Sequence, residues 1–245
     1  MAFEIYLIAA FILMLAAFTK GVTGFGSSLI AIPLLAAFVY LPEDARAVVV
    51  TVNLILNIFI LASAKKLSLS ALKPFWVLIV TVFIASILSG FLLPSFDTRW
   101  FNIVLGILLI LTALNNLFTI RFKIEVPQRY FIPVGILGGT LNTLIGAGSV
   151  PVLIFLANTN LKKADFRISI LFFLLILNSG SLISFVINAN YGWNIVYQAL
   201  IFMPVVLVGS FLGIRSQDKV NELTFQRVIA VLLLVMGING IFNIF

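Results

Sequence analysis

Residues 20–28 read Lys20-Gly-Val-Thr-Gly24-Phe-Gly26-Ser27-Ser28 and interrupt an apolar segment that runs from Ile5 to Tyr40. A second interruption divides the segment from Tyr130 to Ala157, where small and polar residues again gather: Gly138, Gly139, Asn142, Gly146, Gly148 and Ser149. We expect each segment to form two short half-helices around a break. Backbone released from helical pairing at membrane depth is tolerated only where protein or a water-filled cavity satisfies it. Both breaks are therefore predicted to lie inside a helical bundle.

The composition of the chain is typical of an integral membrane protein. Its 245 residues are 62% hydrophobic and 9% charged, whereas soluble proteins carry about 25% charged residues. A spanning helix needs roughly 20 apolar residues. Uninterrupted runs of that order extend over Asp44 to Ala64, Phe75 to Pro94, Trp100 to Ile120, Phe166 to Ile187, Ile195 to Ile214 and Phe225 to Phe245. We predict an all-α polytopic membrane protein, with one transmembrane domain over residues 1–245 and no soluble domain.

Several classes of chemistry are poorly supplied by this sequence. The chain has no Cys and no His, which removes thiolate metal sites and the commonest general base. Its acidic residues all fall at segment ends or in links, so no carboxylate is expected in mid-span. The net charge of +7 is divided into small groups between apolar runs, which is typical of cytoplasmic loops rather than of a nucleic-acid-binding surface. Neither enzymatic activity nor a metal or other cofactor is expected.

The two halves of the chain share a pattern. Asp44, Arg46 and Asn57 recur 121 positions later (165 − 44) as Asp165, Arg167 and Asn178. The break Gly24-Phe-Gly26-Ser27 recurs 122 positions later (146 − 24) as Gly146-Ala-Gly148-Ser149. An internal duplication is the simplest explanation, with repeat 1 at about residues 1–121 and repeat 2 at about 129–245.

Basic residues predict how the halves are oriented, because Lys and Arg collect in cytoplasmic loops. They crowd four stretches, Lys65 to Lys73, Arg121 to Arg129, Lys162 to Arg167 and Arg215 to Arg227. If all four are cytoplasmic, the first broken segment begins and ends outside and the second begins and ends inside. The fold is then two inverted repeats, each a broken Gly-rich hairpin plus three spanning helices, with both termini outside. Whether each hairpin is re-entrant or fully crosses stays open, and eight simple spans in parallel repeats is the alternative.

Lys20 is the one basic residue within a broken segment. A cation at membrane depth is costly and usually faces a partner or a substrate path, although a Lys can also snorkel to an interface or bond to carbonyls of the break. The half-helix after each break presents unpaired N–H groups and the positive end of a helix dipole, which suits an anion.

Further polar residues follow a helical stripe. Arg46, Asn53 and Asn57 share one face, and Arg167 and Asn178 repeat its two ends. The alternatives for these residues are helix capping and amide bonds between helices. The predicted anion-binding residues are Lys20, Thr23, Gly24, Gly26, Ser27, Ser28, Arg46, Asn53, Asn57, Asn142, Gly146, Gly148, Ser149, Arg167 and Asn178.

The two Gly-rich stretches, from Gly21 to Pro33 and from Gly138 to Pro151, resemble the sulfite exporter TauE/SafE family, also called TSUP. The likeness covers essentially the whole chain. It implies a secondary transporter of sulfite, a sulfonate or a related sulfur anion in the bacterial inner membrane, and we expect alternating access at a midplane site. A passive anion channel is the alternative, and a lipid-directed enzyme is a third hypothesis that lacks obvious catalytic groups. The expected partners are the small anion and the lipid bilayer; a coupling proton or sodium ion and a homo-oligomer stay open.

Overall fold

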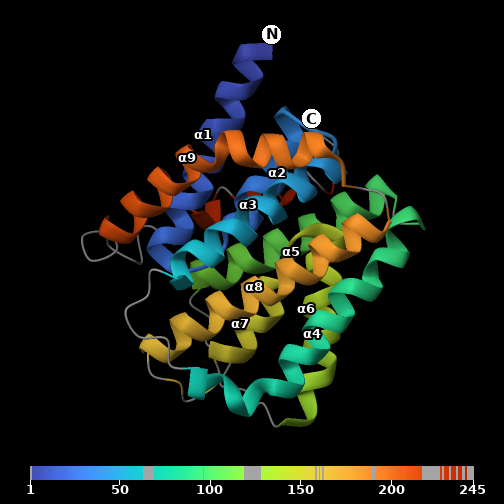
Figure 1. Ribbon diagram of the computed structural model, residues 1–245, viewed down its shortest axis with the longest axis vertical. Coiled ribbons are helices and arrows are strands. Elements are labelled where there is room, and N and C mark those ends of the chain that lie inside the picture. The colour runs from blue at the N-terminus through green and yellow to red at the C-terminus, as the bar shows by residue number, and fades with distance from the viewer. Residues whose placement is uncertain are drawn as a thin grey trace.

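The computed structural model describes residues 2–62, 69–95, 97–118, 128–157, 159, 161, 163–188 and 191–216, with residues 227, 229–231, 233–235, 237, 238 and 241 of the C-terminal segment (Figure 1). These described residues form helices and no strand. In chain order the elements are α1 (Ala2–Thr23), α2 (Ser27–Phe38), α3 (Pro42–Ala62), the 3₁₀ helix η1 (Leu69–Phe75), α4 (Trp76–Leu88), η2 (Ser89–Ser95), α5 (Thr98–Phe118), η3 (Gln128–Tyr130), α6 (Phe131–Ile145), α7 (Ser149–Ala157), α8 (Lys163–Ile187) and α9 (Trp193–Ser216).

The predicted all-α polytopic membrane fold is confirmed. Among the described residues, five helices are long and apolar enough to cross a membrane, namely Glu4–Thr23, Glu43–Ala62, Leu72–Ser95, Asp165–Ile187 and Trp193–Ser216. Large apolar side chains such as Phe11, Trp76 and Phe211 point outward and are exposed, as expected for faces that meet lipid. The predicted span from Phe225 to Phe245 and the basic stretches within 63–68, 119–127 and 217–226 lie partly or wholly outside the described residues.

Both predicted helix breaks are present. Gly24, Gly26 and Gly146 have φ angles of +89°, +84° and +73°, a left-handed conformation that glycine adopts without the clash that a Cβ atom would cause. The chain therefore reverses direction between α1 and α2 and again between α6 and α7.

The expected shortness of the half-helices is wrong for α1. This helix has 22 residues, which is about 33 Å at 1.5 Å per residue and enough to cross a hydrocarbon core. Nothing between Glu4 and Thr19 interrupts the helix, so it continues until the glycines of the break end it. The other three arms are shorter, with 12 residues in α2, 15 in α6 and 9 in α7.

The two hairpins pack in a reciprocal way. The first arm of the N-terminal hairpin, α1, packs mainly against α9, whereas the first arm of the C-terminal hairpin, α6, packs mainly against α4 (Figure 1). Helices α3 and α8 contact each other, and α3 also contacts α9 as α8 contacts α4. The α1–α9 pair thus corresponds to the α6–α4 pair, and the α3–α9 pair corresponds to the α8–α4 pair. In this correspondence α1 is exchanged with α6, α3 with α8 and α4 with α9. Each half therefore completes its packing against a helix of the other half.

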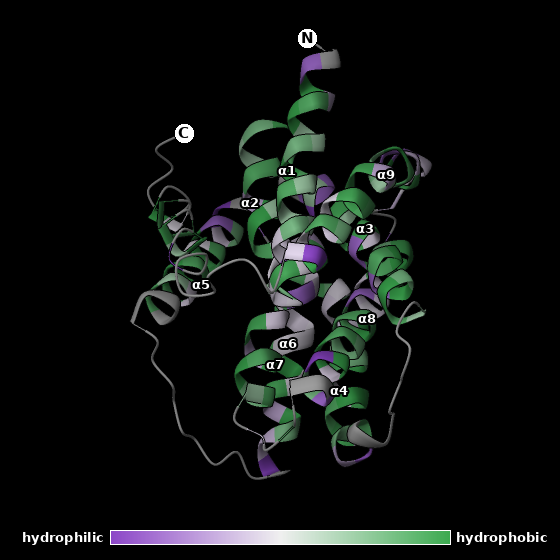
Figure 2. Ribbon diagram, turned by 90° about the vertical axis from the view of Figure 1, so that its left-hand side faces the viewer, coloured by the Kyte–Doolittle hydropathy of each residue, from purple (hydrophilic) through white to green (hydrophobic). Residues whose placement is uncertain are grey.

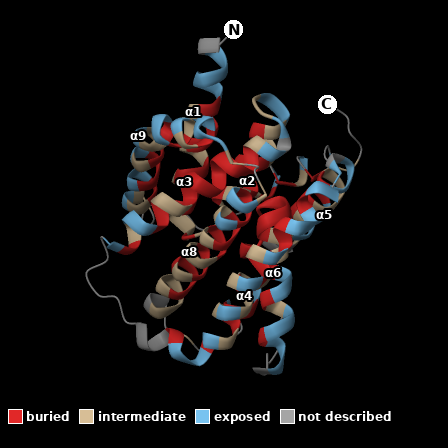
Figure 3. Ribbon diagram, turned by 45° about the vertical axis from the view of Figure 1, so that its right-hand side comes forward, coloured by how far each residue is buried: buried red, intermediate tan, exposed pale blue. Residues whose placement is uncertain are grey.

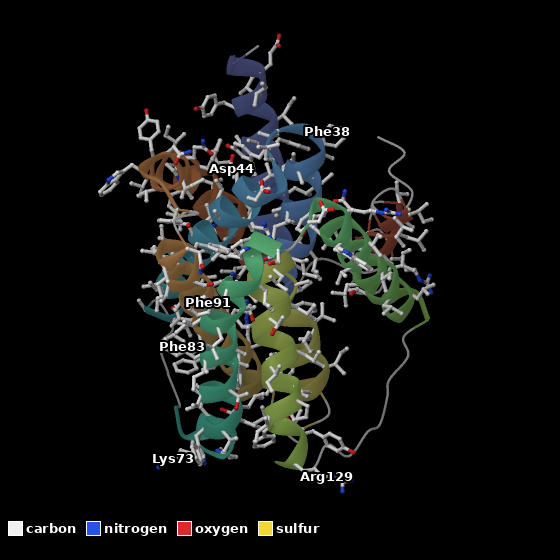
Figure 4. All side chains as sticks on the ribbon, turned by 90° about the vertical axis from the view of Figure 1, so that its right-hand side faces the viewer. Phe38, Asp44, Lys73, Phe83, Phe91 and Arg129 are labelled. Atoms are coloured by element: carbon white, nitrogen blue, oxygen red, sulfur yellow. The ribbon has the colours of Figure 1, made fainter. Side chains whose placement is uncertain are left out.

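The hairpins enter the bundle from opposite ends. Figure 4 shows Phe38, at the end of α2, and Asp44, near the start of α3, at the upper end of the molecule. Arg129, just before α6, and Lys73, just before α4, lie at the lower end (Figure 4). An antiparallel arrangement of this kind is what inverted repeats require. The duplication itself and the orientation of the repeats in a membrane stay predictions.

The interior consists of two apolar clusters. One is built from α1, α2, α3, α5 and α9, together with the end of α6, and the other from α4, α6, α7 and α8. Figure 3 shows buried residues on the inward faces of α2, α3 and α8 and exposed residues on the outward faces of α4, α5 and α6. Small residues allow close contact, because a Cβ atom at Gly139 of α6 would lie 2.6 Å from the backbone nitrogen of Ser86 in α4.

Candidate anion site at the two helix breaks

A buried lysine lies next to the first break. Lys20, in the last turn of α1, is only 2% exposed, and its Nζ donates a hydrogen bond to Asn53 Oδ1 of α3 at 2.9 Å. Ser27 Oγ donates to the same oxygen at 2.7 Å, and Asn53 Nδ2 donates to Ser28 Oγ at 3.1 Å. One amide therefore ties together α1, α2 and α3. The alternative that Lys20 snorkels to an interface is wrong.

The break itself is organised by Thr23. Its Oγ1 lies 2.8 Å from the carbonyl oxygen of Phe25 and 2.9 Å from that of Thr19, and it accepts a hydrogen bond from the Phe25 N–H at 3.3 Å. The Gly24 N–H donates to the carbonyl of Lys20 at 2.7 Å. The Thr23 hydroxyl is thus engaged by backbone, and it shapes the turn that presents Ser27 and Ser28.

A second polar cluster lies next to the second break. The offset of 122 that relates the two breaks places Asn142 of α6 at the position of Lys20. Asn142 Nδ2 donates to Ser181 Oγ of α8 at 2.8 Å and lies 3.4 Å from Asn178 Oδ1. The Thr143 hydroxyl is 2.8 Å from Ser181 Oγ and also lies 2.8 Å from the Ser86 carbonyl of α4. The second cluster also combines amide and hydroxyl groups, but it includes no cation among the described residues.

Thr143, Ser181 and Ser86 were not among the residues predicted from the sequence. Ser181 follows Asn178 by three residues, a spacing that places both on one face of a helix. That spacing could have identified Ser181. The Ser86 carbonyl gives no sequence signal, because every residue carries a backbone carbonyl.

Each of the two predicted arginines contacts a helix of the other half of the chain. Arg46, at the start of α3, is 6% exposed, and its Nη1 donates to the carbonyl of Leu144 in the last turn of α6. Its guanidinium also lies 5.2 Å from the centre of the Phe101 ring. Arg167, at the start of α8, lies with Nη2 3.4 Å from the carbonyl of Gly21 in the last turn of α1. Because the last carbonyls of a helix lack intrahelical partners and form the negative end of its dipole, each arginine caps the hairpin of the other half.

The remaining predicted residues occupy different environments. Asn57 is fully buried, and neither of its amide atoms has a hydrogen-bond partner among the described residues. Ser149 is the first residue of α7 and is 4% exposed. Gly148 serves close packing, because a Cβ atom there would lie 2.9 Å from the backbone nitrogen of Asn142.

The two breaks face each other in the middle of the bundle. A Cβ atom added to Gly146 would lie 4.0 Å from the Cβ of Ser28, and one added to Gly24 would lie 3.9 Å from Cγ of Arg167. Figure 2 shows hydrophilic residues where α1 and α2 approach α6 and α7, within largely hydrophobic helices. A small cavity lined by Ser27 and Asn53, with apolar residues of α1, α2, α3 and α9, has room for about one water molecule.

A family model described as sulfite exporter TauE/SafE matches residues 9–240, a range that includes both helix breaks. The chain belongs to the sulfite exporter TauE/SafE family. No curated protein and no solved structure matches the chain. The TauE/SafE family is a family of membrane transporters, in agreement with the five helices that could cross a membrane.

In this TauE/SafE protein, no nearby negative charge among the described residues would balance a positive charge on Lys20. Within the part of the chain that the structure describes, no carboxylate lies within ion-pair distance of Lys20, and its hydrogen-bond partner is a neutral amide. The described acidic residues are all at helix ends or in links: Glu4, Glu43, Asp44, Asp97 and Asp165. Isolated charges in a low-dielectric interior are unfavourable. An anion from outside the protein would supply the missing counter-charge.

Proposed function

We propose that this TauE/SafE protein is a secondary transporter of a small sulfur oxyanion or organosulfonate in the bacterial inner membrane. The observation that carries the proposal is Lys20, a basic side chain buried at a helix break beside a neutral amide. Membership of a family described as sulfite exporters supports a sulfur anion as the substrate.

The groups around the first break suit a tetrahedral or pyramidal oxyanion. The ammonium of Lys20 would provide the charge, and the hydroxyls of Ser27 and Ser28 would donate to the oxygens. The N-cap residue of α2, Gly26, contributes no side-chain hydrogen bond, so the first N–H groups of α2 remain for a ligand. The second break would add the neutral donors Asn142 and Thr143 from the opposite side.

The size of the small cavity beside Ser27 and Asn53 supports alternating access. A space for about one water molecule is too small for a polyatomic anion, so the hairpins must separate to admit one. The reciprocal packing gives two routes for that separation, with α1 moving against α9 or α6 moving against α4. Opening at one break while the other stays closed would expose the site to one side of the membrane at a time.

Uptake of radiolabelled sulfite and of a radiolabelled sulfonate into proteoliposomes tests the proposal. We expect saturable uptake by the wild type and loss of most uptake in Lys20→Ala, with Lys73→Ala, an exposed lysine at the end of η1, as the matched control. If no sulfur anion is transported, and Lys20→Ala is indistinguishable from the wild type, the proposal is wrong.

A passive anion channel is the second candidate. The absence of a carboxylate near Lys20 among the described residues is compatible with simple anion conduction. Counterflow separates the two mechanisms. Unlabelled sulfite inside the proteoliposomes accelerates the entry of labelled sulfite through a carrier but not through a channel. Large single-molecule currents would favour the channel.

A further inference from the structure

We propose that Lys20 carries the coupling ion of this transporter, a proton that it takes up as the anion binds and gives back as the anion leaves. The inference rests on the proposed function and deepens it, because it names the coupling partner of the same site. It assigns that role to a lysine rather than to a buried carboxylate.

The surroundings of Lys20 favour its charged form only when an anion is present. The Nζ atom has one hydrogen bond among the described residues, to the neutral Asn53 Oδ1 at 2.9 Å, and no ion pair. A neutral amine can donate this bond as well as an ammonium can. Without an anion, this bond to a neutral amide would offset little of the free-energy cost of burying a positive charge.

Charged groups on the neighbouring elements do not compensate Lys20. Arg167 of α8 is a like charge, and its Nη2 lies 3.4 Å from the carbonyl of the adjacent Gly21. Arg215, in the last turn of α9, is exposed, and α2 carries no titratable side chain. On α3 the nearest acidic residue, Asp44, precedes Asn53 by nine residues, which is about 13 Å along the helix. Among the side chains that the structure describes, the other charged or titratable ones on these elements are Glu4, Tyr6, Glu43, Arg46, Asp165 and Tyr197.

The second half provides an internal comparison. Asn142 occupies the place of Lys20, and it forms hydrogen bonds with Ser181 and Asn178 that need no charge. One ionisable group at one of two related positions is sufficient for a proton to accompany one anion. A cation site made of oxygens is not required for coupling.

Lys20 takes up one proton and releases one proton for each anion that crosses. When the site faces one side, the lone pair of the Lys20 amine forms a bond with a proton from water, and the resulting ammonium pairs with the entering anion. On the other side the N–H bond breaks, the proton returns to water and the anion leaves. Anion binding and proton uptake are linked, so each strengthens the other. A monoanion then crosses together with one proton and no net charge.

Methanesulfonate is the appropriate probe, because it stays a monoanion at neutral pH and exchanges no proton itself. Calorimetric titration of the full-length protein at mildly alkaline pH, in two buffers of different ionisation enthalpy, gives the number of protons taken up per anion. We expect about one for the wild type. In proteoliposomes, methanesulfonate uptake should alkalinise the outside medium and should not respond to an imposed membrane potential.

Lys20→Arg and Lys73→Arg form the matched pair. Arginine stays protonated in proteins, so Lys20→Arg should bind methanesulfonate with proton uptake near zero, whereas Lys73→Arg, at an exposed position, should behave as the wild type. If Lys20→Arg does not fold, the wild-type proton count decides alone. Binding of methanesulfonate without proton uptake overturns this inference and leaves the proposed function standing. Failure of every sulfur anion to bind the wild type overturns the proposed function and this inference together.

Discussion

Asn53 is the side chain on which the first polar cluster depends. Its Oδ1 accepts hydrogen bonds from Lys20 and Ser27, and its Nδ2 donates to Ser28. Asn53→Asp would place a carboxylate of nearly the same shape beside Lys20. The internal ion pair would then compete with the substrate anion, so we expect at least about tenfold weaker binding of methanesulfonate, about 1.4 kcal/mol, with the thermal unfolding temperature in detergent retained.

Asn178→Asp is the matched control for Asn53→Asp. Asn178 is equally buried, at 3% exposure, but its described partner is the amide of Asn142 rather than a cation. A carboxylate there has no counter-ion, so this variant should lower the unfolding temperature. Wild-type affinity in Asn53→Asp would contradict the assignment of Lys20 as the counter-charge of the substrate.

Gly26 is required for its backbone conformation alone. Its φ is +84°, and a Cβ atom added to it would meet nothing within 4 Å. Gly26→Ala should therefore cost about 1–2 kcal/mol of folding free energy through strain, and Gly26→Asn should cost less because Asn tolerates the left-handed region. Unfolding in detergent measures both variants. Equal stability of Gly26→Ala and the wild type would show that the break relaxes to another conformation.

Some residues of the site could be predicted from their type and position in the sequence. The contacts between residues of distant segments could not. Lys20 was identifiable because one cation among apolar residues has few structural explanations. Thr143 was not, because single hydroxyl residues occur on many membrane helices without a ligand, and Ser181 had only its spacing of three residues from Asn178 to indicate it. The bond from Arg46 to the Leu144 carbonyl depends on how two distant segments pack. A residue pattern within one segment carries no information about that packing.

At the scale of elements, the two arginines join the halves at the helix breaks. Arg46 is buried and bonds to the Leu144 carbonyl, whereas Arg167 is half-buried and its contact with the Gly21 carbonyl is a long 3.4 Å. Arg46→Ala leaves a buried carbonyl without this donor, and we expect a loss of about 1–3 kcal/mol. Arg167→Ala should cost less, because its bond is longer and closer to water.

The comparison of the two arginine variants uses thermal unfolding in one detergent, with Arg215→Ala as a control at an exposed position. Equal losses in Arg46→Ala and Arg167→Ala would mean that burial does not distinguish the two caps. No loss in either would mean that the helix ends find other donors.

The apolar runs predicted the bounds of uninterrupted helices well, but they did not predict how far α1 continues into the first break. The run from Asp44 to Ala64 predicted α3 (Pro42–Ala62), and the run from Phe166 to Ile187 predicted α8 (Lys163–Ile187). The break at Gly24 and Gly26 was also predictable, because glycines ended an apolar run. The full length of α1 was not expected, since the residues from Lys20 to Ser28 were interpreted as a break between two short half-helices. In fact the helix includes Lys20 and ends only at Thr23.

At the scale of the whole molecule, each hairpin rests on a helix of the opposite half. Because α1 packs against α9 and α6 packs against α4, a movement of either hairpin changes a surface between halves rather than one within a half. The Lys20 cluster joins α1 to α2 and α3, whereas Thr143, next to Asn142, reaches the Ser86 carbonyl of α4. The bonds from Arg46 to the Leu144 carbonyl and from Arg167 to the Gly21 carbonyl join each break to a helix of the other half. Such an arrangement suits a transporter whose two openings must not occur together.

The orientation of the halves can be tested with cysteines, because the chain contains none. Lys73 and Gly192 precede α4 and α9, which are exchanged by the reciprocal packing, and both residues are exposed. If the repeats are inverted, these links lie on opposite sides of the membrane. We expect Gly192→Cys to react with an impermeant maleimide in intact cells and Lys73→Cys to react only after permeabilisation.

Each outcome of this labelling has a different physical meaning. Reaction of both cysteines from one side would support parallel repeats, and the opposed entry of the hairpins in Figure 4 would then need a different membrane plane. Reaction of Lys73→Cys from outside and Gly192→Cys from inside would keep the inversion but contradict the charge rule, because the links rich in Lys and Arg would face outward. The expected pattern places the entrance of α1 outside and that of α6 inside. In this orientation, an anion bound at Lys20 would contact both the hairpin that enters from outside and the hairpin that enters from inside. Lys20 would then exchange its proton with water on either side, as coupling to a proton requires.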